Sequence, residues 1–109
     1  MTDQQINLAI AEACGWRRRD NTDITRLVTA DWAKWQRSKD GAWCSSLPNY
    51  CHDLNAMHEA ESKSFDNGMQ PYAWQMELQR VCGDYPATFC ATARQRAEAF
   101  LRTKGLWRE

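Results

Sequence analysis

The stretch ATARQRAEAFLRTKGLW, residues 91–107, is the clearest indicator of the fold. Thr92, followed three residues later by Gln95, forms a capping box that begins a helix, and no Gly or Pro follows until Gly105. Apolar residues then recur on one side, at Ala93, Ala97, Phe100 and Leu101. Because alanines let a helix sit close to its neighbour, the stretch predicts a closely packed amphipathic helix.

Three further helices are expected before it. The first begins at Thr2 or Asp3 and ends before Gly15, and its apolar residues recur at helical spacing. The second runs from about residue 53 to 64. The third is bracketed by Pro71 and Gly83. Residues 71–83 also alternate as a strand would, but the Pro/Gly bracket and the helix-favouring Gln, Met, Glu and Leu favour a helix.

A short β-hairpin is expected between the first and second helices. Trp35 and Trp43 flank an Asp-Gly pair, which is a hairpin signal. The arms are expected near residues 31–36 and 42–46. Residues 24–28 are either an additional short strand or one helical turn. The prediction is therefore a mostly helical α+β fold with about four helices and one hairpin.

Size and composition agree with a single domain, 1–109. Mean hydropathy is -0.74, and six tryptophans supply large apolar areas to a core poor in aliphatic residues. Fourteen basic and fourteen acidic residues cancel, so overall attraction to nucleic acid or an anionic membrane is not expected. A polar start without a signal peptide, and no apolar run near the ~20 residues of a membrane span, predict a cytoplasmic location. The five cysteines, an odd number with irregular spacing, are expected to be reduced thiols.

Catalysis and metal binding are not expected. His52 and His58 are six residues apart and point in different directions on a helix, and with Cys51 and Glu59 they show none of the usual zinc-ligand spacings. A nucleophilic Cys44 or Cys51 with a histidine base has no supporting motif. We therefore predict no cofactor and a protein that is not an enzyme.

Two surfaces are candidates for binding. Tryptophans around the hairpin and two exposed polar residues of the second helix form a candidate interaction surface: Trp32, Trp35, Trp43, Asn55 and Glu59. Burial in the core is the ordinary interpretation of the tryptophans, and interface anchors or base-stacking platforms are the alternatives. The run Arg17-Arg18-Arg19 is either a solvated loop after the first helix or an anion and nucleic-acid contact.

Three segments together resemble a known family: IAEACGW at 10–16, LPNYCHDLNAMHEAE at 47–61, and residues 91–107. This combination is similar to the small bacteriophage and prophage proteins of the phage ABA sandwich domain family. The resemblance implies a compact mixed helix and sheet domain, and it carries no catalytic or binding residues. Its implied alternative fold is a three-layer α/β/α sandwich with a small antiparallel sheet.

The expected function combines the resemblance to phage proteins with the lack of residues spaced as in a catalytic motif. The main hypothesis is a non-enzymatic phage accessory protein that binds a host or phage protein, such as a host factor or a defence system. A nucleic-acid-binding accessory factor and a small-ligand or nucleotide binder are the alternatives. Homo-oligomers are left open, because the alanine-rich face of the last helix suits a second copy as well as the core.

Overall fold

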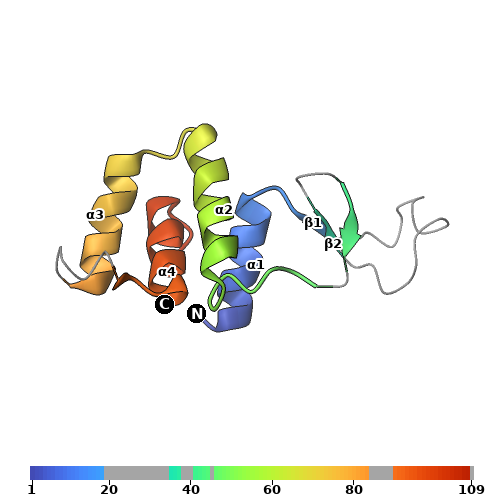
Figure 1. Ribbon diagram of the computed structural model, residues 1–109, viewed down its shortest axis with the longest axis horizontal. Coiled ribbons are helices and arrows are strands. Elements are labelled where there is room, and N and C mark those ends of the chain that lie inside the picture. The colour runs from blue at the N-terminus through green and yellow to red at the C-terminus, as the bar shows by residue number, and fades with distance from the viewer. Residues whose placement is uncertain (19–34, 38–40, 45, 84–89, 109) are drawn as a thin grey trace.

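A computed structural model describes residues 1–18, 35–37, 41–44, 46–83 and 90–108. Within these ranges the chain forms four helices that lie side by side in Figure 1: α1 Asp3–Ala13, α2 Leu54–Asp66, α3 Pro71–Cys82 and α4 Ala93–Thr103. The mostly helical α+β fold predicted from the sequence is confirmed. Residues 71–82 are a helix rather than a strand.

The helix ends follow from local capping chemistry. Thr2 begins α1 and Thr92 begins α4, each with a capping box in which a glutamine three residues later bonds back to the threonine. Asp53 begins α2, because its carboxylate accepts hydrogen bonds from two amides of the first turn. Gly83 ends α3 with a φ of 90°, in the left-handed region that favours glycine.

Helix α4 is the centre of the packing, because each of the other three helices contacts it. Phe100 and Leu101 are fully buried on α4, and Ile6, Ile10 and Met57 meet the same core from α1 and α2. A second, smaller cluster joins α3 to α4: Leu78, Ala91 and Ala99. The core is therefore assembled around one helix.

Two observations define the buried faces of α4 and α2. Ala97 and Ala99 are fully buried within the chain, so the alanine-rich face of α4 is not available to a second copy. Leu54 has the helical spacing of a core residue, yet it is 44% exposed. It is the first residue of α2, and the buried side of that helix begins only at Met57.

A small antiparallel sheet lies beside the helices, with the order β1-β2-β3 (Figure 1). Its strands are β1 Arg17–Arg18, β2 Trp35–Gln36 and β3 Trp43–Cys44. Strands β2 and β3 pair as the predicted hairpin, with Trp35 opposite Cys44. Of the other residues in the predicted arms, Ala42 and Ser46 lie outside the strands. Residues 31–34 and 45, and the segment 24–28, lie outside the described residues.

Residues 17 and 18 form a strand and not the solvated loop expected after the first helix. Arg17 and Arg18 pair with Gln36 and Trp35 of β2. The chain leaves α1 through Gly15, and extended residues there satisfy their backbone hydrogen-bonding groups on the neighbouring strand.

We predict that Phe100→Ala lowers the free energy of unfolding by about 3–5 kcal/mol, because it opens a cavity where the helices meet. Urea denaturation followed by circular dichroism measures this. Leu54→Ala is the control and should change stability by less than about 0.5 kcal/mol, since Leu54 is exposed. A loss below about 1 kcal/mol for Phe100→Ala would show that α4 is not the centre of the core.

Candidate functional site

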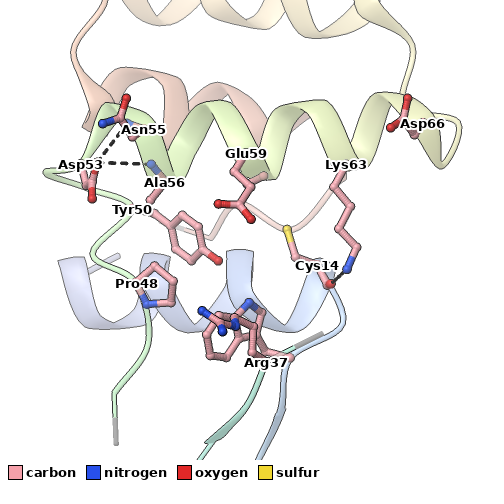
Figure 2. A pocket seen from close by; sticks show the side chains of 12 residues that line it. Cys14, Arg37, Pro48, Tyr50, Asp53, Asn55, Ala56, Glu59, Lys63 and Asp66 are labelled. Atoms are coloured by element: carbon pink, nitrogen blue, oxygen red, sulfur yellow. Dashed lines mark hydrogen bonds between the residues drawn. The ribbon is translucent and has the colours of Figure 1, made fainter. Parts of the chain in front are cut away.

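A cleft of about 900 Å³ lies between α2 and the turn that follows α1 (Figure 2). Helix α2 and its N-cap form one wall along their length, and the rest is formed by residues that lie after α1, after β2 and before α2. The lining residues are Cys14, Trp16, Arg37, Pro48, Tyr50, Asp53, Asn55, Ala56, Glu59, Ala60, Lys63 and Asp66. Segments far apart in the sequence therefore build one surface.

The floor of the cleft is apolar and uncharged. Tyr50, Cys14 and Ala60 are buried, and Trp16 packs against the same core. Burial raises the pKa of Tyr50, although a hydrogen bond with the Trp16 side chain opposes the shift. Burial also raises the pKa of Cys14, and the opposing effect of the nearby Lys63 ammonium is smaller. Both groups are therefore protonated at neutral pH, and Cys14 is a poor nucleophile.

Lys63 closes one end of the cleft. Its Nζ donates a hydrogen bond of 2.6 Å to the carbonyl oxygen of Cys14, the C-cap of α1 (Figure 2). The last carbonyls of a helix lack partners within the helix and carry partial negative charge. The ammonium of Lys63 therefore satisfies the end of α1 and ties it to α2.

The rim of the cleft is charged and exposed. Asp53, Glu59 and Asp66 lie along the α2 wall, and the half-buried Arg37, directly after β2, faces them from the other wall. Glu59 points into the cleft toward Tyr50 (Figure 2). The arrangement is an apolar floor with a polar edge, which suits binding of a partly apolar, partly charged molecule.

The predicted interaction surface is only partly brought together. Asn55 and Glu59 are exposed, as expected, and both line the cleft one helical turn apart. Trp35 is half-buried in β2 and does not line it. Trp32 and the side chain of Trp43 lie outside the described residues.

Of the three arginines of the predicted anion contact, the structure describes the side chain of Arg17, which is exposed on β1. Arg19 and the side chain of Arg18 lie outside the described residues. The structure therefore leaves the arginine run as a prediction.

Four important lining residues were missed by sequence reasoning: Trp16, Arg37, Tyr50 and Lys63. The nearest sequence signal is Gly15, which was expected to end the first helix; directly after it, the amide of Trp16 donates a hydrogen bond to the carbonyl oxygen of Ala11. The segment from 47 to 50 has no periodicity, so nothing in it indicated that Tyr50 would be buried.

No hydrogen bond joins a cysteine to a histidine in the part of the chain that the structure describes. Burial raises the pKa of Cys51 to about 11, and its Sγ faces the carbonyl oxygen of Asp3. His52 Nε2 lies 2.9 Å from the Asp3 carboxylate, and His58 is exposed. Among the described residues, no group of three or more His, Cys, Asp or Glu has the arrangement of a metal site.

The most strongly perturbed carboxylate lies outside the cleft, between α2 and α4. Glu61 is buried, and burial raises its pKa to about 7 although Arg96 opposes this with an ion pair of 3.2 Å. Its other oxygen, Oε1, has no hydrogen-bond partner among the described residues. Arg96 also lies over the ring of Trp74 on α3. One ion pair thus does not offset the desolvation of the carboxylate.

The chain matches no family model, no curated protein and no solved structure. No helix in the described ranges combines the length and apolar character that crossing a bilayer requires. The resemblance to the phage ABA sandwich domain, and the partners it implies, therefore stay predictions.

We predict that Glu61 makes the protein less stable as pH rises from about 4.5 to 7. In this window the folded protein holds a proton that the unfolded chain releases, so the stabilisation present at low pH is lost as pH passes the folded pKa. The expected loss is roughly 3 kcal/mol. Urea denaturation of the wild type and of Glu61→Gln at pH 5 and pH 8 measures it.

The neutral amide of Glu61→Gln should remove this part of the pH dependence. Glu59→Gln, on the exposed side of the same helix, should keep it. The interpretation is wrong if Glu61→Gln retains the wild-type difference between the two pH values.

Proposed function

We propose that this protein is a non-catalytic accessory protein of a phage or prophage, and that it binds a segment of a host protein in the cleft beside α2. The observation that supports this proposal is the cleft itself, with its apolar floor and charged rim. The proposed setting is the bacterial cytoplasm, where the partner is a host factor or a component of a defence system.

The length of the cleft favours a polypeptide segment over a small molecule. Its lining residues run from Asp53 to Asp66 along one straight helix, which corresponds to ~20 Å at the rise of an α-helix. An extended segment of about six residues spans that distance. A compact ligand would leave one end of the α2 wall uncontacted.

The chemistry of the lining also suits a protein partner. Protein interfaces combine a buried aromatic and apolar centre with a polar, solvated rim. Trp16 and Tyr50 supply the aromatic centre, and Asp53, Asn55 and Glu59 belong to the rim. Aromatic side chains of this kind commonly contribute most of the binding energy.

A catalytic role has little support in the described chemistry. The buried thiols of Cys14 and Cys51 have raised pKa values, whereas a nucleophilic cysteine needs a lowered one. Glu61 titrates near neutral pH but is closed off between α2 and α4. We therefore assign binding, and not group transfer, to the cleft.

Capture from bacterial lysate tests the proposal. We expect the wild type to retain a specific host protein, quantified by mass spectrometry, and Glu59→Lys to reduce its retention by about tenfold, equivalent to the loss of ~1.4 kcal/mol. Ser62→Lys is the matched control, since Ser62 is exposed on α2 and does not line the cleft. The proposal fails if Glu59→Lys and Ser62→Lys retain the same proteins in the same amounts.

A small-ligand role is the second candidate, because the volume of the cleft lies within the range of ligand pockets. Arg37 and Lys63 place two cations beside the aromatic floor, which is compatible with a nucleotide. Thermal-shift screening with nucleotides separates the two candidates. A ligand at about 100 times its Kd adds ~2.7 kcal/mol of stability. We expect no such shift, and a shift that Lys63→Met abolishes would favour the nucleotide.

A further inference from the structure

A second groove, of about 600 Å³, runs along the exposed side of α1 and shares no residue with the cleft. It is lined by Met1, Gln5, Leu8, Ala9, Glu12, Ala13, Leu106 and Arg108. Leu8 and Leu106 are 36% and 40% exposed. The lining residues of α1 recur at helical spacing, so the groove follows one side of this helix. Leu8 is exposed there, and Ala9 and Ala13 are partly buried against the core.

Opposite charges mark the two ends of this groove. Arg108 lies at the N-terminal end of α1, where its amide donates to Sδ of Met1 and its carbonyl accepts from the Met1 amine. Glu12 lies near the C-terminal end, ~15 Å away at the rise of a helix. Both residues are exposed, and neither forms an ion pair with another described residue.

Leu8 lies about halfway between the two charges. A surface with a positive end, an apolar middle and a negative end is complementary to itself when one copy is turned end to end. A two-fold axis near Leu8 brings Glu12 of each copy to Arg108 of the other. This reciprocity is what an isologous dimer interface requires.

We propose that the groove along α1 binds a second copy of this chain, with the two α1 helices antiparallel and Leu8 near the two-fold axis. Ala9 and Ala13 in the groove allow the helices to approach closely. Antiparallel helices also place unlike dipole ends side by side. The proposal is independent of the cleft, which stays open to its own partner.

Sedimentation velocity across a concentration series of the untagged chain tests this. We expect a monomer–dimer equilibrium in the wild type. Glu12→Arg and Arg108→Glu should each weaken the dimer by about tenfold, because each replaces two attractive encounters by two repulsive ones. The double variant Glu12→Arg/Arg108→Glu should restore wild-type affinity, since the two charges exchange places.

Leu8→Asp should abolish the dimer, because it places two carboxylates near the axis. Leu54→Asp is the matched control, as Leu54 is an exposed leucine of α2 outside the groove. Circular dichroism verifies that every variant is folded. A wild type that stays monomeric throughout the series would overturn the proposal, and so would a dimer that is insensitive to the charge reversals and to Leu8→Asp.

Discussion

The close packing of α4 is the constraint on which the rest of the structure depends. Its inward side chains include both small and large residues, with fully buried Ala97 and Ala99 beside Phe100 and Leu101. The alanines bring the neighbouring helices near, and the two larger side chains fill the space between α1, α2 and α4. With α1 and α2 held on one helix, the cleft between α2 and the turn after α1 has walls fixed by the core.

Helix α4 also takes part in a buried ion pair, between Arg96 and Glu61 of α2. Arg96 also covers Trp74, so α2, α3 and α4 meet at a buried polar group. Buried ion pairs of this kind contribute little net stability compared with apolar packing. They do fix which side chains face one another, since the charge of Arg96 needs its partner at one position.

Prediction from the sequence succeeded where the determining forces are local. The capping threonines, Pro71 and Gly83 set helix ends through contacts a few residues apart, and these are visible in one-dimensional spacing. The cleft depends instead on contacts such as Lys63 with Cys14, 49 residues apart, which no period encodes. Asn55 and Glu59 were identified because exposure follows from helical phase, whereas Tyr50 follows no periodic pattern.

The hydrogen bond from Lys63 to the end of α1 has a consequence for the energetics of binding. Widening the cleft at that end would leave the carbonyl of Cys14 without its ammonium partner, so the separation of the two walls is set before any partner arrives. Preorganisation of this kind reduces the conformational entropy that association must overcome. Because the same contact stabilises the last turn of α1, fraying of that helix and opening of the cleft are thermodynamically linked.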